Sequence, residues 1–235
     1  MRVLIDLAFR DPALNLALEE AILDGVRREL VPPTLRIWRN PRCVVVGRGQ
    51  KPEEEVDLDL ARRWRIRVVV RPSGGGTVYH HPGNLLFSLF LPLTGKWRSV
   101  RESQEELSGL LAGAVRRKFG LPVEVRDGGL FVRGMKVSGS AQLRRGALLH
   151  HGTLLLFPDV IPMEKVLRAL QPGYSPSGVP SRPAPVVDLS SLLGRDISLE
   201  EGVRLVLEAF RPLGALKLAT ISLREWALAD QILSS

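Results

Sequence analysis

The sequence predicts an α+β fold, because helical and strand patterns mix along the chain instead of alternating strictly. Successive strands are joined by short, glycine-containing turns, which favours antiparallel pairing over a doubly wound parallel sheet. At 235 residues the chain is long enough to bury a sizeable core, as one large domain or as one domain with a small appendage. Its hydrophobic content of 45% and charged content of 25% are ordinary for a globular protein.

Six segments have the apolar spacing of amphipathic helices. In the first of them Leu14, Leu18 and Ile22 form one apolar stripe, and Asp11 precedes the stripe at the N-cap position. The predicted helices are 12–28, 56–64, 103–119, 163–170, 199–210 and 223–233.

Short apolar runs rich in β-branched residues predict strands. The run 66–70 ends directly before three glycines, and 85–91 is apolar enough for a central strand. Residues 171–189 contain five prolines and are expected to form a long loop, which is either an inert connector or a cover over a neighbouring cleft. The predicted strands are 35–38, 43–47, 66–70, 85–91, 123–125, 130–137 and 147–156.

The segment 71–85, RPSGGGTVYHHPGNL, is the most informative part of the chain. Glycine allows positive φ and a close approach of backbone N–H groups to a ligand. Amides turned outward after a strand form a concave, partly positive nest that suits a phosphate or a carboxylate, and Arg71 stands at the expected mouth of this nest. The spacing matches neither a P-loop nor a dinucleotide fingerprint. The alternative interpretation is a glycine-rich turn without a ligand.

Two later segments favour the ligand site. Residues 135–142, MKVSGSAQ, place a lone lysine between an apolar strand and a small-residue turn, and 150–156 read HHGTLLL. In order and spacing, SGGGTVYHHPGN, KVSGSAQ and HHGTLLL resemble the lipoate-protein ligase A family, which shares a superfamily with biotin protein ligases and octanoyltransferases. Weaker matches are NLALEE at 15–20 and VVVGRGQ at 44–50, so the resemblance covers about residues 10–215.

The resemblance implies a biotin/lipoate ligase-like catalytic domain, with a central mixed, largely antiparallel sheet, flanking helices and a cleft across one sheet face. It also implies a two-step reaction. ATP and Mg²⁺ activate lipoate to lipoyl-adenylate, and the lipoyl group then passes to a lysine of a lipoyl-carrier domain, in a 2-oxoacid dehydrogenase or a glycine-cleavage H-type protein. Both steps need charge stabilisation and not a protein nucleophile. Lys136 matches the family's catalytic lysine, and a flexible ammonium suits a bridging contact.

The same match implies the ligand-binding residues. Arg71 is expected to hold phosphate oxygens through a bidentate contact, with backbone donors at 75–77 and an adenylate groove lined by 78–79. His80 and Asn84 match positions near the ligand, where each is either a ligand contact or a satisfied polar group behind one. The predicted set is Arg71, Gly75, Gly76, Thr77, Val78, Tyr79, His80, Asn84, Lys136, Gly139, Ala141, His151, Gly152 and Thr153.

Two further segments are expected to complete the cleft. Residues 138–141 are expected to form a close-approach turn opposite the glycine loop. Thr153 is expected to line the cleft and His151 to orient it, whereas His150 is expected to be merely exposed.

The chain departs from the family pattern in two places. The family carries an Asn-Asp pair seven to eight residues before the catalytic lysine, where the acid helps with magnesium and adenylate. Here these positions hold Gly128 and Gly129, and Asp127 is the only candidate metal ligand left. The chain also stops where the family's large catalytic domain ends. We therefore expect residues 1–235 to form one catalytic domain without the additional C-terminal domain, and we hypothesise that a separate accessory subunit serves adenylation.

Two alternative functions stay open. The residues at 79–83 and before Lys136 look more like octanoyltransferases, which would transfer an octanoyl or lipoyl group from a thioester through a cysteine. The single cysteine, Cys43, precedes an apolar strand, where a small buried residue is expected, and 171–174 read QPGY where the transferases place their cysteine. One cysteine also excludes an internal disulfide and a cysteine-based zinc cluster. The other alternative is a homologue that binds lipoate or a carrier protein without catalysis.

The net charge of +8 and the isoelectric point near 10.3 come from an excess of arginine. The arginines are scattered and lack interleaved aromatic residues, so we expect no nucleic-acid binding. An electropositive surface suits an anionic nucleotide and an acidic carrier domain. No apolar stretch approaches the ~20 residues of a membrane span, and the first residues lack the pattern of a signal peptide. We therefore expect a cytoplasmic enzyme without membrane association.

Overall fold

The computed structural model describes residues 1–234. Its strands form two sheets, and apolar, β-branched runs of the chain supply strands to both. The strands are β1 (Arg2–Asp6), β2 (Thr34–Trp38), β3 (Cys43–Val46), β4 (Arg67–Val70), β5 (Val78–His80), β6 (Asn84–Pro92), β7 (Val123–Arg126), β8 (Gly129–Val132), β9 (Met135–Arg144), β10 (Ala147–Leu155) and β11 (Lys217–Ala219).

The larger sheet has the strand order β11-β1-β2-β6-β10-β9-β8-β7, and the smaller sheet has the order β4-β3-β5. In the larger sheet β1 pairs parallel with β2 and with β11, and the remaining neighbours pair antiparallel. The predicted α+β fold with a mixed, largely antiparallel sheet is confirmed.

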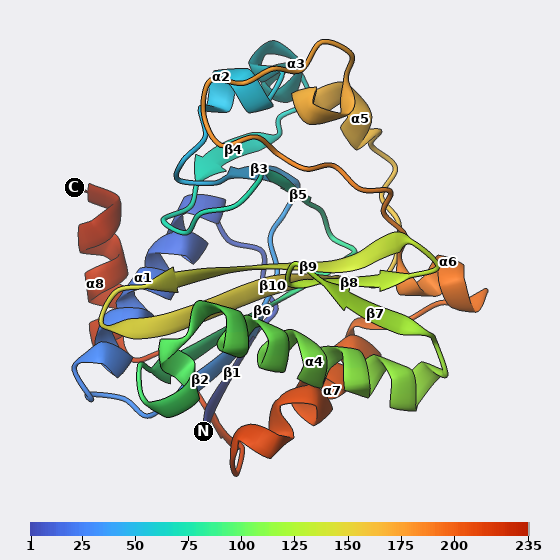
Figure 1. Cartoon of the computed structure of the whole chain (residues 1–235). Helices are drawn as coiled ribbons and strands as arrows, with labels where there is room; N and C mark the ends of the chain where they lie inside the picture. The colour runs from blue at the N-terminus through green and yellow to red at the C-terminus, as the bar shows by residue number, and fades with distance from the viewer. Residues whose placement is uncertain (235) are drawn as a thin grey trace.

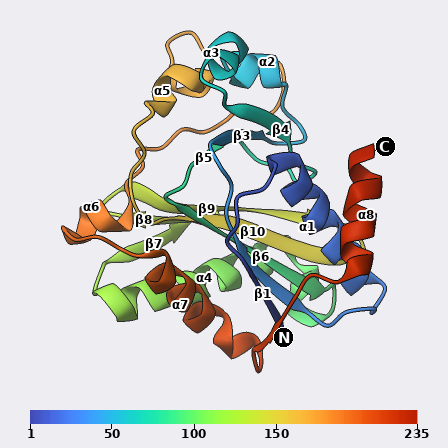
Figure 2. The same ribbon diagram turned by 180° about the vertical axis from the view of Figure 1, so that it is seen from behind.

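Helices cover both faces of the larger sheet (Figures 1 and 2). One face carries α4 and α7, and the other carries α1 and α8. The smaller sheet stands over the α1 side and bears the short helices α2, α3 and α5 on its far face. The helices are α1 (Pro12–Arg27), α2 (Pro52–Glu55), α3 (Leu58–Arg63), α4 (Val100–Phe119), α5 (Met163–Val166), α6 (Leu189–Leu193), α7 (Leu199–Phe210) and α8 (Leu223–Ser234). Within residues 1–234 none of them combines the length and apolarity needed to cross a membrane.

Alternation along β6 divides its side chains between the two faces of the larger sheet. Leu85, Phe87 and Leu89 enter the main core with α4 and α7. Ser88 points the other way, where its hydroxyl donates to buried Glu19 of α1 at 2.5 Å. The buried polar side chains Ser88 and Glu19 therefore lie on the side of the larger sheet that faces α1 and the smaller sheet.

The long, strongly periodic elements were predictable. The helices at 12–28, 103–119, 199–210 and 223–233 correspond to α1, α4, α7 and α8. The Asp11 carboxylate caps α1 by accepting from the N–H of Ala13, as predicted. The segment 163–170 instead divides into α5 and a short 3₁₀ turn, Arg168–Leu170. The sequence analysis did not predict β1, β5, β11, α2 and α6.

The prediction of one strand over 130–137 is wrong. Arg133 and Gly134 have φ values of 51° and 80°, and two successive left-handed residues form the turn of a hairpin between β8 and β9. The expected turn at 138–141 is also wrong, because Ser138, Gly139 and Ala141 lie inside the extended strand β9.

We predict that Phe87→Ala destabilises the fold by about 3–5 kcal/mol. The Phe87 side chain is 2% exposed and packs against the ring of Phe210 at a centroid distance of 5.4 Å. Urea unfolding monitored by circular dichroism measures the change. The control Leu218→Ala, at a side chain 76% exposed on edge strand β11, should stay within about 0.5 kcal/mol of the wild type. Equal effects of the two substitutions would contradict the described core.

Candidate active site

The glycine loop between β4 and β5 is held from inside by Arg71, whose side chain is buried. Its Nε donates to Ser73 Oγ at 2.9 Å, and its Nη1 donates to the carbonyl of Val45 at 3.1 Å. Its Nη2 donates to the carbonyls of Gly74 and Gly76, at 2.7 and 2.8 Å. One guanidinium thus pulls two carbonyls of the loop inward.

These inward carbonyls turn the neighbouring amides outward. A trans peptide plane places its N–H opposite its C=O, so the N–H groups of Gly75 and Thr77 point away from Arg71. Gly75 has a φ of +88°, which favours glycine. A Cβ on Gly47 would lie 2.0 Å from the carbonyl oxygen of Gly75, so glycine is also required beneath the loop. The loop has the outward amides of the predicted anion-binding nest.

The predicted position of Arg71 at the mouth of the nest is wrong. A guanidinium has five N–H donors, and four of those of Arg71 are used inside the protein. One N–H is left, so a bidentate contact with a phosphate is not available in this arrangement. Burial lowers the pKa of Arg71 to about 10, so the group keeps its charge at neutral pH. Its role in this structure is to shape the loop.

A β-bulge brings Lys136 to the same face of the sheet as Gly139. Leu130 pairs with Ser138, but Phe131 pairs with Lys136, which leaves Val137 as an extra residue. Strict alternation would place positions 136 and 139 on opposite faces. Because of the bulge, a Cβ on Gly139 would instead lie 3.0 Å from Lys136 Nζ.

Within the described residues the Lys136 ammonium has no counter-charge. Its side chain passes over two glycines, since a Cβ on Gly129 would lie 3.2 Å from Lys136 Cε. Burial lowers the pKa of Lys136. Within residues 1–234, Nζ has no hydrogen-bond or ion-pair partner. A partly buried cation without a partner favours an anionic ligand.

Gly128 and Gly129 leave no acid beside the lysine. Gly128 is buried, has a φ of +74°, and its carbonyl accepts from Ser140 Oγ at 2.8 Å. Asp127, the candidate metal ligand, lies exposed in the turn between β7 and β8. In the described part of the chain no cluster of three His, Cys, Asp or Glu side chains is placed to hold a metal. The donors found here are a cation and amides, which fit an anion, and we derive no step through Mg²⁺.

His80 is buried and bonded within the protein through one ring nitrogen. Its Nδ1 lies 3.1 Å from Asn40 Nδ2, and the Asn40 side-chain oxygen accepts from Asn15 of α1 at 2.8 Å. The Asn40 amide therefore donates, His80 Nδ1 accepts, and the proton of the neutral ring is on Nε2. Burial, with Arg71 and His151 nearby, lowers the pKa of His80 to about 3, so the ring is neutral at pH 7.

Asn84 and the third motif lie close to these groups. Asn84 donates to the carbonyl of Tyr79 at 3.2 Å, and its Oδ1 is buried without a partner in the described chain. His151 Nε2 lies 2.8 Å from Ser73 Oγ in the glycine loop. Two residues on, Thr153 pairs with Gly139 and accepts its N–H at 3.4 Å. The three sequence motifs therefore meet at one site.

The proline-rich segment fastens the glycine loop to the lysine strand. Ser181 Oγ accepts from the N–H of Thr77 at 3.0 Å and donates to Glu55 Oε2 at 2.6 Å. Four residues on, the carbonyl of Pro185 accepts from the N–H of Lys136 at 2.7 Å. Four residues span at most about 14 Å, which limits the separation of the loop and the lysine. One outward amide of the nest is occupied by this segment.

Residues 11–211 match the family model of the lipoyl protein ligase A/B catalytic domain. The chain belongs to this family. A similar protein is the octanoyltransferase LipM of Symbiobacterium thermophilum, 34% identical over 84% of this chain and 81% of that protein. Another is the mitochondrial lipoyl amidotransferase of Mus musculus, 34% identical over 79% of this chain; there the chain spans about half of the relative, 48%.

Solved structures show the same fold. Lipoate-protein ligase A bound with ATP superposes with a TM-score of 0.81 at 24% identity, covering 100% of this chain and 95% of that chain. A bipartite lipoate protein ligase from Thermoplasma acidophilum, described with its E2 lipoyl domain, gives a TM-score of 0.80 at 24% identity over 100% and 93%. Biotin protein ligase from Aquifex aeolicus gives 0.51 at 13% identity over 90% and 68%. The predicted ligase-type fold is confirmed.

Several predicted site residues of this family member make packing contacts. Tyr79 packs its ring with the cluster on the far face of the smaller sheet, and its hydroxyl donates to Asp159 at 2.8 Å. Val78 packs toward α1. The absent side chain of Gly152 makes room for Phe87, because a Cβ there would lie 2.5 Å from that ring. These contacts give Tyr79 and Gly152 packing roles, whereas Val78 lies on the same face of β5 as His80.

The expectation that His150 is exposed is wrong. Its side chain is fully buried against the ring of Phe87, and burial lowers the pKa of His150 to about 3. Ala141 pairs with His151 across β9 and β10, which places it beside the third motif.

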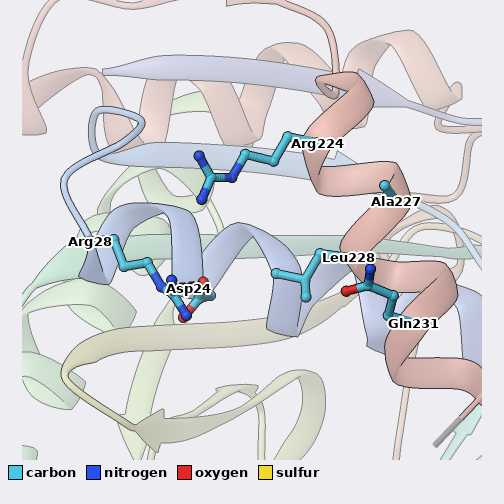
Figure 3. A pocket seen from close by; sticks show the side chains of 6 residues that line it. All are labelled: Asp24, Arg28, Arg224, Ala227, Leu228 and Gln231. Atoms are coloured by element: carbon cyan, nitrogen blue, oxygen red, sulfur yellow. Dashed lines mark ion pairs between the residues drawn. The ribbon is translucent and has the colours of Figure 1, made fainter.

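A pocket lies outside the candidate active site (Figure 3). It lies between the C-terminal end of α1 and the helix α8, and it contains none of the predicted site residues. Its lining is Asp24, Arg28, Arg224, Ala227, Leu228 and Gln231.

We predict that Cys43 does not react in the native protein. The thiol is fully buried in β3, and burial raises its pKa well above the ordinary value. Ellman's reagent should label Cys43 only after addition of denaturant. Rapid labelling of the native protein would contradict the described position of the thiol.

We predict that Ser181→Ala loosens the proline-rich segment. The substitution removes the bonds to Thr77 and Glu55 and one to Gln50. Limited proteolysis should then cleave within 171–187 about tenfold faster. The control Ser175→Ala changes an exposed serine of the same segment and should leave the cleavage rate unchanged. Equal rates in both variants would show that the Ser181 contacts do not hold the segment.

Proposed function

We propose that this protein is a lipoate-protein ligase that works through lipoyl-adenylate. In the first step the lipoate carboxylate attacks the α-phosphorus of ATP and expels pyrophosphate. In the second step an amine of a carrier-domain lysine attacks the acyl carbonyl and releases AMP and a proton. The carrier is a lipoyl domain of a 2-oxoacid dehydrogenase or an H-type protein, and the compartment is the cytoplasm.

The observation that carries this proposal is the unpaired ammonium of Lys136. Both steps place negative charge on phosphate and carbonyl oxygens, and a preorganised cation stabilises such charge. The outward amides of Gly75 and Thr77 supply further donors. A phosphate at Thr77 would replace Ser181 Oγ, which now accepts that N–H. His80 Nε2–H adds a neutral donor.

The absence of a carboxylate at positions 128 and 129 affects the two reaction steps differently. Transfer from a preformed adenylate needs no contact with pyrophosphate or a metal, whereas activation of lipoate does. Since no carboxylate side chain stands at Gly128 or Gly129, we propose that the chain performs the transfer step alone and activates lipoate with a separate accessory subunit. The lipoate protein ligase of Thermoplasma acidophilum is bipartite, which supports this division.

Thioester transfer is the second candidate, because the LipM relative is named an octanoyltransferase. A cysteine nucleophile must be an accessible thiolate, and Cys43 is buried with a raised pKa. The burial of Cys43 thus argues against this chemistry. A homologue that binds without catalysis is the third candidate, and the same assay tests it.

We predict distinct rates in a three-arm assay with purified protein and a lipoyl domain. The arms contain lipoate with MgATP, synthetic lipoyl-adenylate, or octanoyl-acyl carrier protein. Lipoyl-adenylate should be used at least ten times faster than lipoate with MgATP, and octanoyl-acyl carrier protein should give no product. A fast third arm that Cys43→Ser abolishes would establish thioester transfer instead. Inactivity in every arm would leave a binding homologue.

We predict that Lys136→Ala lowers transfer from lipoyl-adenylate by roughly 10²–10³, the effect of removing one charge-stabilising donor. The matched control is Lys217→Ala, an exposed lysine on edge strand β11, which should keep full activity. Circular dichroism checks that both variants are folded. Normal transfer by Lys136→Ala would refute the role given to this ammonium.

A further inference from the structure

A buried chain of hydrogen bonds runs from helix α1 to the glycine loop. The Glu19 carboxylate is fully buried, and both of its oxygens lie 3.0–3.1 Å from His151 Nδ1. His151 Nε2 lies 2.8 Å from Ser73 Oγ, which also accepts from Arg71 Nε at 2.9 Å. The proposed reaction steps make no use of Glu19 or Ser73.

The carboxylate fixes the direction of these bonds. Burial alone would raise the pKa of Glu19, but His151, the Ser88 hydroxyl and Arg36 outweigh it and lower the pKa. An ionised carboxylate only accepts, so His151 Nδ1 carries a proton. In the neutral ring Nε2 is then an acceptor. The Ser73 hydroxyl donates its hydrogen to Nε2 and keeps a lone pair for Arg71.

The Glu19 carboxylate is itself held in place. Ser88 Oγ of β6 donates to it at 2.5 Å, and the indole Nε1 of Trp38 donates to Ser88 Oγ at 2.8 Å. The bonds donated by Trp38 Nε1 and by Arg71 Nε both lead toward the same carboxylate. An oriented set of this kind has one low-energy arrangement, which limits the positions open to Ser73.

We propose that Glu19 and His151 are positioning residues for the glycine loop. By fixing Ser73 Oγ they fix Arg71 Nε, and the same guanidinium holds the carbonyls of Gly74 and Gly76 inward. The outward amides then face an acyl-adenylate. The proposal rests on the proposed function for the identity of this ligand, and not for the state of the loop.

The order Glu, His, Ser resembles a hydrolytic triad, but its geometry serves a different purpose. A nucleophilic serine must meet its substrate, and Ser73 is 1% exposed. Its oxygen already accepts a hydrogen bond from a guanidinium, which lowers its nucleophilicity. These hydrogen bonds therefore fix the position of the glycine loop and take no part in a covalent step.

A double-mutant cycle in the ligand-free protein tests the proposal. Glu19→Gln neutralises one end of the chain, Ser73→Ala removes the hydroxyl at the other, and hydrogen exchange of the Thr77 amide, which is bonded to Ser181 Oγ, reports the loop. Each single variant should speed this exchange about tenfold. The double variant should be no faster than either, because both changes break one chain. A hundredfold effect in the double variant would show independent contributions and overturn the proposal.

The control is Glu20→Gln, the same substitution one residue further along α1. Glu20 is partly exposed and pairs with Arg145 at 2.8 Å, so its removal should not change exchange in the loop. Should Glu19→Gln fail to fold, Glu19→Asp replaces it in the cycle. Nitrogen-15 spectra of the His151 ring give a second readout. A proton on Nδ1 and none on Nε2 is expected in the wild type, and the reverse tautomer would overturn the proposal.

Binding of a non-reactive lipoyl-sulfamoyl adenosine separates this proposal from the proposed function. Glu19→Gln and Ser73→Ala should each weaken its binding about tenfold, with the Glu20→Gln control unchanged. If the wild type does not bind the compound but the exchange cycle is non-additive, the proposed function fails and the positioning role stands. If every variant binds equally well and exchange is additive, the positioning role fails alone.

Discussion

The inward contacts of Arg71 are the interaction on which the site depends. A glycine loop has many accessible backbone states, and ordering its residues costs free energy. One buried guanidinium offsets that cost by binding the carbonyls of Gly74 and Gly76 together with the Ser73 hydroxyl. The amides of Gly75 and Thr77 turn outward as a consequence. A cation placed behind the loop also makes its outer surface more positive, so the same side chain shapes the nest and contributes to its field.

The position of Lys136 depends on the room left by neighbouring glycines more than on a charged partner. Lys136 reaches the site because a bulge at Val137 reverses the alternation of β9. Its side chain then needs room, and Gly129 and Gly139 provide it. A carboxylate at position 129 would contact the methylene chain of the lysine beside its ammonium. In this chain the glycine leaves the cation without an internal partner, and the ligand must supply the counter-charge.

The sequence predicted the parts of the site that depend on local pattern. Three glycines after a β-branched strand indicated outward amides, and Lys136 among small residues indicated a close approach. The direction of Arg71 could not be predicted, because a guanidinium after a strand reaches inward or outward equally well. The bulge depends on the register between β8 and β9, which no single segment encodes. Glu19 had one available signal: it follows Asn15 by four residues, so two polar side chains lie on the buried side of α1.

Those two residues explain why α1 is part of the site and not merely packing for it. Asn15 reaches His80 through Asn40, and Glu19 reaches Ser73 through His151. A helix is rigid over one turn, so two side chains four residues apart set both imidazoles in a fixed relation. Around the site Arg71 and Lys136 are cations, His80 is neutral, and Glu19 is the one anion in this set. Its carboxylate accepts a hydrogen bond from His151 Nδ1. Two cations against one anion leave this set with a net positive charge, which favours an anionic ligand before any contact with an acyl chain is formed.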